Sequence, residues 1–331
     1  MGTPAGASAA PSRAALVLAF ATLYVIWGST YLAIRVAVVS WPPLILAAVR
    51  FTLAGAGLYA WLRARGAPRP SRREWAGAAV IGTLLLGGGN GLVCWAEQWV
   101  PSGEAALIVA SVPLWMTALP WMLGRARMPH PLALAGVALG LAGVGLLVGG
   151  AAPHAQTAAA GHALLGGRIA LLLASLSWSV GSLVASSLAS SAPGSQARRL
   201  ALPRQPAMAS ALEMLAAGPI IAVGAALKGE WGGFHLGTVG GSGWTALVYL
   251  IVFGSFAGFG SYVYLLKHAS PARVSTYAFV NPLVAVLLGT FFAHEALAAR
   301  TLAAAALIVC AVAAVVLGTG RGRAGPPQPD D

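Results

Sequence analysis

Long apolar stretches alternate with short polar or Gly- and Pro-rich segments along the whole chain. A helix that crosses a lipid bilayer needs about 20 mainly apolar residues. Ten stretches are close to this length, so each is predicted to form one membrane-spanning helix. The predicted spans are residues 14–39, 43–62, 75–96, 104–123, 131–149, 167–188, 207–227, 244–266, 272–292 and 301–318.

The amino-acid composition supports a membrane protein. Hydrophobic residues make up 58% of the 331 residues and charged residues only 8%, whereas soluble domains carry about 25% charged residues to cover their wetted surface. Lipid must therefore be the solvent for most of this chain. The predicted fold class is all-α integral membrane with ten transmembrane helices, and membrane lipids are expected partners.

Basic residues are distributed unevenly between the two ends of the predicted spans. Of the 20 Lys and Arg residues, fifteen fall at one alternate set of ends, three at the opposite set, and two, Arg35 and Arg50, within spans. Lys and Arg in short loops favour the cytoplasmic side, so both termini are predicted to be cytoplasmic. The net charge of +12 is spread over short loops, which argues against a nucleic-acid partner.

The two halves of the chain resemble each other in sequence. A shift of 169 residues lays residues 100–149 over residues 269–318 without a gap, and a shift of 163 lays Arg50 over Glu213. These overlays indicate an internal duplication. The predicted organisation is a cytoplasmic N-terminal segment (1–13), a first repeat (14–149), an outer loop (150–166), a second repeat (167–318) and a disordered cytoplasmic tail (319–331).

Each predicted repeat has five helices, which is an odd number, so the second copy must enter the membrane upside down. Inverted repeats of this kind are typical of transporters, whose binding site lies near mid-depth where the repeats meet. The pattern therefore predicts secondary transport of a small-molecule solute by alternating access. It does not set the direction, so export and import both stay open, as does a membrane sensor or enzyme.

Several sequence stretches, taken together, cover residues 14–318 and resemble the EamA family of the drug/metabolite transporter superfamily, within it the YedA-type exporters. The stretches are Tyr24-x-x-Trp27-Gly28-Ser29-Thr30-Tyr31, Trp41-Pro42-Pro43, Val49-Arg50-Phe51, Gly89-Asn90-Gly91, Val100-Pro101-Ser102-Gly103, Glu213-Met214-Leu215-Ala216-Ala217-Gly218 and Val280-Asn281-Pro282-Leu283, followed by Glu295. The resemblance implies two five-helix repeats and efflux of metabolites or drugs, either amino-acid-like or amphipathic, across the cytoplasmic (inner) membrane. Two loops, 150–166 and 190–206, depart from the family pattern in length.

Ionisable residues at membrane depth are costly unless they are paired, so they are candidates for function. Arg50 lies about eight residues inside the second span, roughly 12 Å deep. Glu213 lies inside the seventh span and approaches mid-membrane from the other side. Either the two fix helix packing, or Arg50 attracts an anionic group of a substrate.

Four further charged residues fall near span ends. Glu97 closes the third span, where a buried carboxylate could carry a proton during exchange or could simply be a solvated helix end. Glu104 is expected in the first turn of the next helix, where a negative charge suits the helix dipole. Arg35 and Glu295 are expected at the lipid interface, where long side chains reach the headgroups.

Aromatic and amide side chains inside spans are candidates for the lining of a cavity. Aromatic rings offer large apolar contact areas and can attract cations, and Asn281 stands beside Pro282, which interrupts a helix. The alternatives are lipid-facing or packing roles. The candidate cavity residues are Trp27, Arg50, Asn90, Trp95, Trp178, Glu213, Tyr277 and Asn281, with Glu97 as a candidate for proton coupling.

Other functions find no support in the sequence. The two lysines, Lys228 and Lys267, do not belong to a phosphate-binding Walker A motif, so the chain is not itself an ATP-driven pump. The sequence also shows no group of residues typical of a catalytic site. No cofactor and no metal site are expected. The stripe Gly136-x-x-x-Gly140 and Gly145-x-x-x-Gly149 on the fifth span predicts close helix packing, either within the chain or between the copies of a homodimer.

Overall fold

The computed structural model describes residues 12–149, 158–189, 200–269, 274 and 276–321. Predictions for residues 1–11, part of the outer loop (150–157), part of the central loop (190–199) and the tail from 322 lie outside the described residues. The helices of the membrane spans are α1 (Arg13–Ala37), α2 (Pro43–Ala64), α3 (Arg72–Gly82), η1 (Thr83–Gly91), α4 (Leu92–Ala96), α5 (Ser102–Val109), α6 (Val112–Met122), α7 (Pro131–Val148), α8 (Ala158–Ala189), α9 (Pro206–Leu227), α10 (Gly241–Tyr249), η4 (Leu250–Ala257), α11 (Gly258–His268), α13 (Tyr277–Phe292) and α14 (Ala299–Arg321). Two short 3₁₀ helices, η2 (Glu230–Gly233) and η3 (Leu236–Thr238), lie between α9 and α10.

The prediction of ten spans is confirmed. Within the described residues, nine helices are long and apolar enough to cross a membrane, and Val280–Phe292 of α13 is a shorter tenth apolar helix. Three spans are composite: α3, η1 and α4 form the third, α5 and α6 the fourth, and α10, η4 and α11 the eighth. The chain is a multi-pass membrane protein.

Local sequence signals set where several helices begin. Proline occupies the first turn of α2, α7 and α9, where its missing N–H costs no hydrogen bond. Ser71 and Glu74 form a capping box at the start of α3, in which the Ser71 hydroxyl accepts from the Glu74 N–H and the Glu74 carboxylate accepts from the Ser71 N–H. These signals explain why several predicted starts lie close to the observed ones.

One helix begins much earlier than the hydropathy pattern predicts. The sixth span starts at Ala158 in α8, nine residues before the predicted start at residue 167. The extra turns are rich in Ala and Leu, which are the strongest helix formers. The outer loop is therefore shorter than predicted. Arg168 lies well inside this helix.

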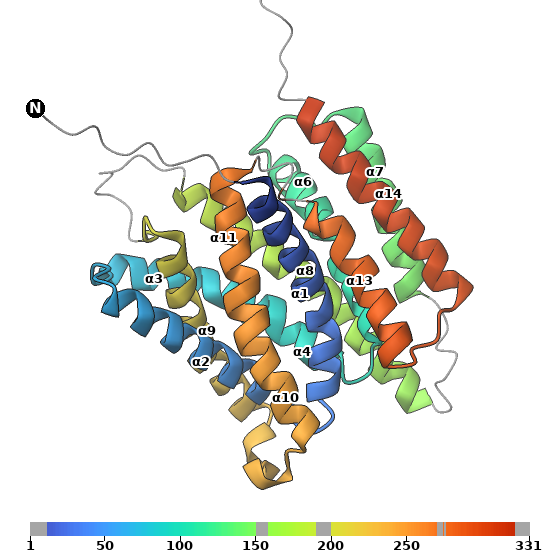
Figure 1. The fold of residues 1–331 in the computed structure, drawn as a ribbon. Coiled ribbons are helices and arrows are strands. Elements are labelled where there is room, and N and C mark those ends of the chain that lie inside the picture. Colours follow the sequence, from blue (N-terminus) through green and yellow to red (C-terminus); the bar gives the residue numbers. More distant parts are fainter. Residues whose placement is uncertain (1–11, 150–157, 190–199, 270–273, 275, 322–331) are drawn as a thin grey trace, which may run out of the picture.

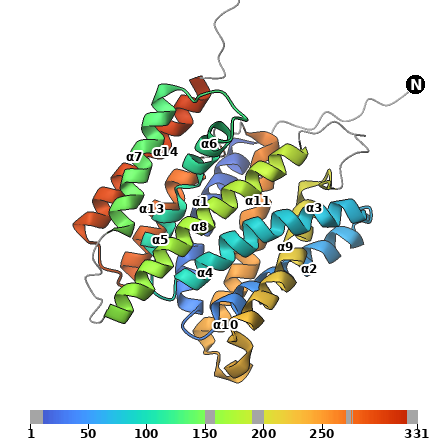
Figure 2. The same cartoon turned by 180° about the vertical axis from the view of Figure 1, so that it is seen from behind.

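The helices form a bundle with two pairs at its opposite edges, seen from both sides in Figures 1 and 2. Helices α7 and α14 lie side by side at one edge, and α2 packs along α9 at the other. Helix α1 lies between them and contacts α13, α11 and α10. The first residue of α1 and the last residue of α14 lie at the same end of the bundle, here called the terminal end (Figure 1). The opposite end is called the distal end.

Small residues bring the edge pairs into close contact. An added Cβ at Gly136 of α7 would lie 2.7 Å from the carbonyl oxygen of Ala311, and one at Gly318 of α14 would lie 2.6 Å from the amide nitrogen of Ala133. At the other edge, a Cβ at Gly55 of α2 would lie 2.7 Å from the amide nitrogen of Leu215. Gly136 and Gly140 of the predicted stripe are thus used for close packing within the chain, whereas a Cβ at Gly145 would meet no atom within 4 Å.

The third and the eighth spans share a feature that the sequence did not predict. Each is α-helical at both ends and π-helical in the middle, over the nine residues of η1 and the eight of η4. Most π-helical segments in proteins are single-turn bulges, and they occur often at functional sites. A long π-helical segment in the third helix of each half is therefore a shared structural specialisation of the two halves.

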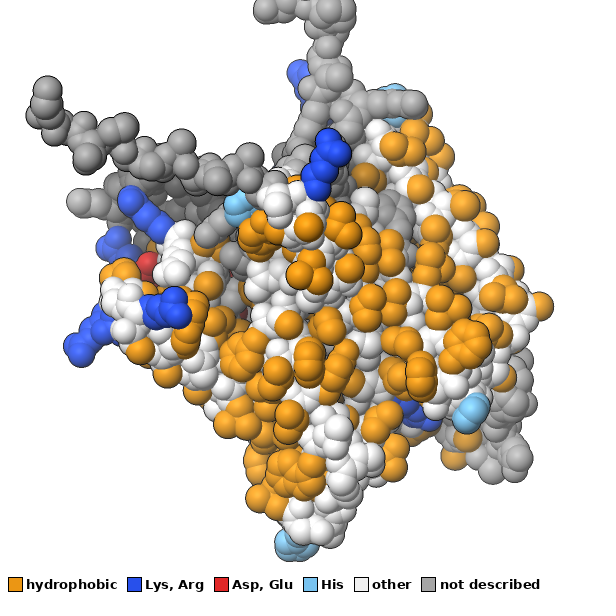
Figure 3. Space-filling model, in the orientation of Figure 1, with side chains coloured by type: hydrophobic (Ala, Val, Ile, Leu, Met, Phe, Trp, Pro, Cys, Tyr) orange, Lys and Arg blue, Asp and Glu red, His pale blue; other side chains and the backbone are white. Residues whose placement is uncertain are grey.

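The outer surface of the bundle fits a lipid environment. Hydrophobic side chains cover most of the face seen in Figure 3, whereas most of the visible Lys and Arg side chains lie toward the terminal end. The exposed large apolar side chains come from several helices, including Leu53, Leu141, Leu173 and Leu287. Such a surface would be unstable in water and is stable in lipid.

Candidate substrate site

Arg50 lies on α2 and is buried, with 5% of its surface exposed. Its Nε donates a long hydrogen bond of 3.4 Å to the hydroxyl of Ser255 in η4, and its guanidinium carbon lies 4.9 Å from the ring centroid of Phe51. Its NH1 nitrogen has no hydrogen-bond partner among the described residues. The guanidinium is therefore enclosed by neutral groups and retains free donor capacity.

The π-helical segment η4 shapes the wall that faces Arg50. The Ser255 hydroxyl donates to the carbonyl oxygen of Leu250, five residues earlier, at 3.1 Å. Its lone pairs remain available to accept the hydrogen bond from Arg50. A Cβ at Gly254 would lie 3.1 Å from the NH2 nitrogen of Arg50, so this approach depends on glycine. The adjacent Tyr249 hydroxyl is 2.6 Å from the hydroxyl of Ser29 on α1.

The second π-helical segment, η1, packs against α8. The Ser177 hydroxyl donates to the carbonyl oxygen of Leu84 at 2.7 Å. A Cβ at Gly89 would lie 2.9 Å from the Trp178 ring. Asn90 is half-buried in this segment. The structure thus brings the candidate residues Trp178 and Asn90 to the same contact between η1 and α8.

Trp27 lies at the centre of an aromatic cluster built by α1, α11 and α13. Its ring centroid is 5.2 Å from that of Tyr277, 5.4 Å from that of Tyr262 and 6.5 Å from that of Phe259. A Cβ at Gly258 would lie 2.5 Å from the indole nitrogen of Trp27. The candidates Trp27 and Tyr277 therefore lie together, as edge-to-face rings.

Two further candidate residues lie on the helices around this aromatic cluster. Asn281 of α13 is 8% exposed, and its side-chain oxygen has no hydrogen-bond partner among the described residues. Glu213 of α9 is half-buried and lies close enough to Tyr262 to interact with it electrostatically. Both add polar groups to the interior of the bundle.

Glu97 is completely buried at the distal end, directly after α4. Neither of its carboxylate oxygens has a hydrogen-bond partner among the described residues. The guanidinium of Arg35 donates instead to the backbone carbonyl oxygens of Glu97 and Gln98, the latter at 2.9 Å. Arg35 therefore joins α1 to the end of the third span, and its position at the lipid interface stays a prediction. A solvated helix end is excluded for Glu97.

Trp95 lies near Glu97 but makes contacts of a different kind. Its ring is 4.7 Å from that of Trp99, and the ammonium of Lys228 lies 5.1 Å from its centroid. The Lys228 contact is a cation–π interaction between the end of α9 and the third span. Trp95 is therefore placed with the distal end and not with the aromatic cluster around Trp27.

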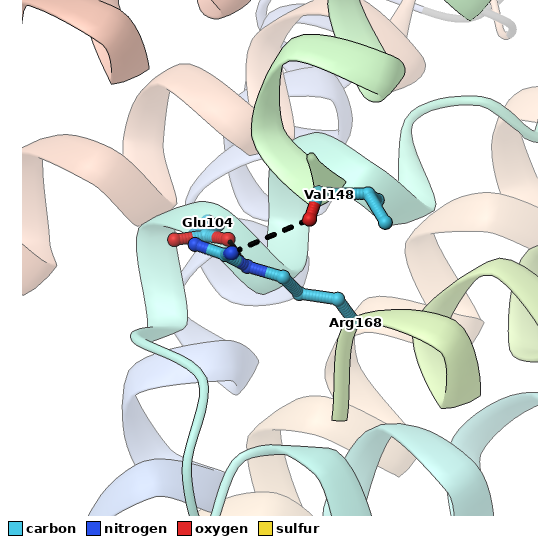
Figure 4. Close-up of polar contacts among 3 residues, drawn as sticks. All are labelled: Glu104, Val148 and Arg168. Carbon is cyan, nitrogen blue, oxygen red and sulfur yellow. Dashed lines mark hydrogen bonds and ion pairs between the residues drawn. The ribbon is translucent and has the colours of Figure 1, made fainter. Parts of the chain in front are cut away.

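Glu104 and Arg168 form a buried ion pair, 2.6 Å from Oε1 to Nε, drawn in Figure 4. Glu104 does lie in the first turn of α5, as predicted, but the sequence did not indicate its partner on α8. The Arg168 NH1 also donates to the carbonyl oxygen of Val148 at 3.4 Å (Figure 4). This pair connects α5 to α8 and to the end of α7.

Two carboxylates of the second half bind the beginnings of helices in the first half. Glu295 accepts from the Ser102 N–H at 2.7 Å, the Ser102 hydroxyl at 2.8 Å and the Gly103 N–H at 3.1 Å. Glu230 accepts from the N–H groups of Leu44 and Ile45 at 3.0 and 3.1 Å. Both carboxylates occupy the place of a helix N-cap and interact with the positive end of the helix dipole. The sequence did not indicate that Glu295 binds the start of α5, and its position at the lipid interface stays a prediction.

Among the described residues, no three His, Cys, Asp or Glu side chains come together as they would around a metal ion. The polar interior consists instead of separate groups. Arg50 faces η4, the aromatic cluster lies beside α11, and Glu97 lies at the distal end. The interior of the bundle thus holds a cation, a group of aromatic rings and a carboxylate in three separate places.

Comparisons with known proteins agree with this architecture. The model of the EamA-like transporter family matches residues 14–149 and 165–317. The chain is 42% identical over 298 residues to the uncharacterized inner membrane transporter YedA of Escherichia coli (strain K12), covering 89% of each protein. It is 24% identical to the uncharacterized transporter YvbV of Bacillus subtilis (strain 168), covering 92% of each. A solved crystal structure with 24% identity superposes with a TM-score of 0.60 over 92% of this chain and 99% of the other, which shows the shared fold. The chain belongs to the EamA-like transporter family.

Proposed function

We propose that the protein is a secondary active transporter that exports small metabolites or drugs across the cytoplasmic membrane by alternating access. The observation that carries this proposal is that the NH1 nitrogen of Arg50 and both carboxylate oxygens of Glu97 are buried inside an apolar bundle with no hydrogen-bond partner among the described residues. Buried unpaired charges are too costly to persist for packing alone and mark the paths of solutes or ions. An interior that receives polar solutes or protons explains their presence.

The two halves provide the moving parts. The family match falls on two separate stretches of similar length, and each half carries a π-helical segment in its third span. Five helices per half place the halves in opposite orientations in the membrane. The substrate then binds between them and is exposed first at one end of the bundle and then at the other.

The terminal end faces the cytoplasm. Fifteen of the 20 basic residues belong to the span ends on this side, and short loops rich in Lys and Arg stay in the cytoplasm. Tags at the two ends of the chain should both be inaccessible to impermeant reagents in intact cells. If the tag at only one end of the chain were accessible, the number of membrane crossings would be odd, and this orientation would be contradicted.

Glu97 carries the coupling proton. Its carboxylate is buried and unbonded, and it lies near enough to Glu295 and Arg35 to interact with both electrostatically. Tyr31 and Cys94 are its other titratable neighbours. Arg35 is held by backbone carbonyl oxygens, so it does not lock Glu97 as a closed ion pair. A carboxylate in this setting can gain and lose a proton as its surroundings change.

A reconstituted vesicle assay tests the function. Purified protein is expected to move at least one member of a panel of amino acids, cationic drugs and sugars faster than empty vesicles do, and an imposed pH gradient should change the rate. If the protein moved none of them while showing ligand-dependent turnover or partner binding, the transporter proposal would be abandoned.

Glu97→Gln tests the proton-coupling role. We expect the variant to fold and to lose the dependence of transport on the pH gradient, because glutamine keeps the shape of the side chain but cannot titrate. Glu74→Gln is the matched control, because a capping box accepts Glu or Gln at this position. An unchanged pH profile in Glu97→Gln would remove Glu97 from the coupling mechanism.

A further inference from the structure

Arg50 presents a buried positive charge that no described residue neutralises. Its nearest polar contact is the neutral hydroxyl of Ser255, and its electrostatic neighbour is the thiol of Cys94. Glu97 interacts instead with Glu295 and Arg35. A guanidinium remains protonated in proteins, and a buried charge without a partner is strongly destabilising. The missing counter-charge is therefore expected from outside the chain.

The chemistry of the free donors defines the kind of anion. A guanidinium presents parallel N–H groups that match the two oxygens of a carboxylate. Here NH1 has no partner among the described residues, whereas the NH2 side of the guanidinium packs closely against Gly254. A carboxylate that occupies this position would accept from the free N–H groups of Arg50. The adjacent hydroxyl of Ser255 already orients the guanidinium through Nε.

The aromatic cluster lies along the same wall of the eighth span. Gly254 faces Arg50 and Thr30, and Gly258, four residues further toward the terminal end, faces the Trp27 indole. Gly254 belongs to the π-helical segment η4 and Gly258 is the first residue of α11, so both lie in the same part of the span. A ligand whose carboxylate binds Arg50 would therefore place its body toward Trp27 and its neighbouring rings Tyr262 and Tyr277.

We propose that the substrates are small carboxylates with an apolar, ring-bearing body, held by Arg50 at the carboxylate and by the Trp27 cluster at the ring. This assignment rests on the proposed transport function and names the chemical class that the site accepts. Arg50 and Trp27 act as specificity-determining residues, and the glycines at 254 and 258 allow both side chains to approach the eighth span.

Equilibrium binding to the purified full-length protein tests this assignment. The probes are 3-phenylpropionate, its neutral isostere 3-phenylpropionamide and the cation 3-phenylpropylammonium, each measured near neutral pH by calorimetry. We expect the carboxylate to bind at least about tenfold more tightly than the amide, as a charge-assisted bidentate pair provides. Equal binding of the carboxylate and the amide, preference for the cation, or no binding of any probe would overturn the proposal.

Variants of Arg50 locate the preference within the protein. Arg50→Met should bind the amide as the wild type does and lose the advantage of the carboxylate, whereas Arg50→Lys should keep part of it. Arg65→Met is the matched control, because Arg65 lies at the exposed end of the same helix. A carboxylate preference that persists in Arg50→Met would contradict the assignment. If Arg50→Met does not fold, the affinities of the wild type for the carboxylate and the amide still test the proposal.

Failure of the site and failure of the function give different results. Binding of the carboxylate without flux in vesicles would leave the site in place and remove the transport proposal. Transport of another solute, together with equal binding of the carboxylate and the amide, would leave the transport proposal in place and remove the assignment of the site.

Discussion

The α7–α14 pair and the π-helical spans show two opposite ways of using small residues. In the pair, Gly136 and Gly318 bring two regular helices into backbone contact, and the packing there is apolar. In η1 and η4, glycines accompany distorted backbone, and hydroxyls of Ser177 and Ser255 bond to carbonyl oxygens of the π-helical segments. The pair therefore has the properties of a scaffold. The π-helical spans have those of an adjustable interior.

The largest expected effect comes from the scaffold. In Gly136→Leu the new side chain would meet the backbone of α14, since even a Cβ would lie 2.7 Å from the Ala311 carbonyl oxygen. Overpacking costs about 1–3 kcal/mol and occasionally more, so the unfolding temperature in detergent should fall by several degrees or the protein should not fold. Gly145→Leu is the control on the same helix, because no atom lies within 4 Å of its added Cβ. Equal stability of the two variants would refute the scaffold role.

An intermediate effect is expected in the π-helical segment η1. In Gly88→Ala the new Cβ would lie 2.1 Å from the Ser177 hydroxyl, which must move and lose its bond to Leu84. One hydrogen bond contributes about 1 kcal/mol, so folding should survive while transport in vesicles slows several-fold. Gly87→Ala, whose nearest contact is 3.9 Å away, should transport as the wild type does. If both alanine variants transported equally, the Ser177 contact would have no part in the cycle.

The smallest effect concerns Glu230, which lies outside the membrane spans. Burial raises the pKa of this carboxyl above its usual value, although the N–H groups of Ile45 and Leu44 and the charge of Lys228 act in the opposite direction. A folded-state pKa above the unfolded one means that the folded protein binds the proton more tightly. The resulting stabilisation is present at acidic pH and decreases as pH rises through the folded pKa.

The Glu230→Gln variant measures this contribution. The difference in unfolding temperature between wild type and variant should change by a degree or two between acidic and neutral pH, in favour of the wild type at acidic pH. Glu74→Gln, at the terminal end, serves again as the control. If the difference in unfolding temperature favoured the wild type at neutral pH instead, the two N–H donors would lower the pKa of Glu230 by more than burial raises it.

Much of the fold could be predicted because membrane spans are a local property of the sequence. The ten spans follow from hydropathy, and proline or a capping box marks several helix starts. The early start of α8 was missed because Ala-rich turns at Ala158 are too weakly apolar for a hydropathy criterion. The π-helical segments were missed because the periodicity of a uniformly apolar span does not distinguish α from π geometry.

The candidate site could be predicted only in part. Burial of Arg50 and Glu97 follows from their positions in or beside apolar segments. Their surroundings do not, because the partners are far apart along the chain: Ser255 is 205 residues from Arg50, and Glu295 is 193 residues from Ser102. Nothing local in the sequence encodes such a pairing. The same reason explains why the sequence did not reveal the acceptors of Arg35, which are backbone carbonyl oxygens.

The carboxylates of Glu230 and Glu295 have a consequence for how the two halves can separate. Together they hold five donors at the beginnings of α2 and α5, and each bond joins one half of the molecule to the other. Any movement that separates the halves at the distal end must leave two helices uncapped. Opening of the distal end in the proposed cycle would therefore have to replace these five hydrogen bonds with bonds to water.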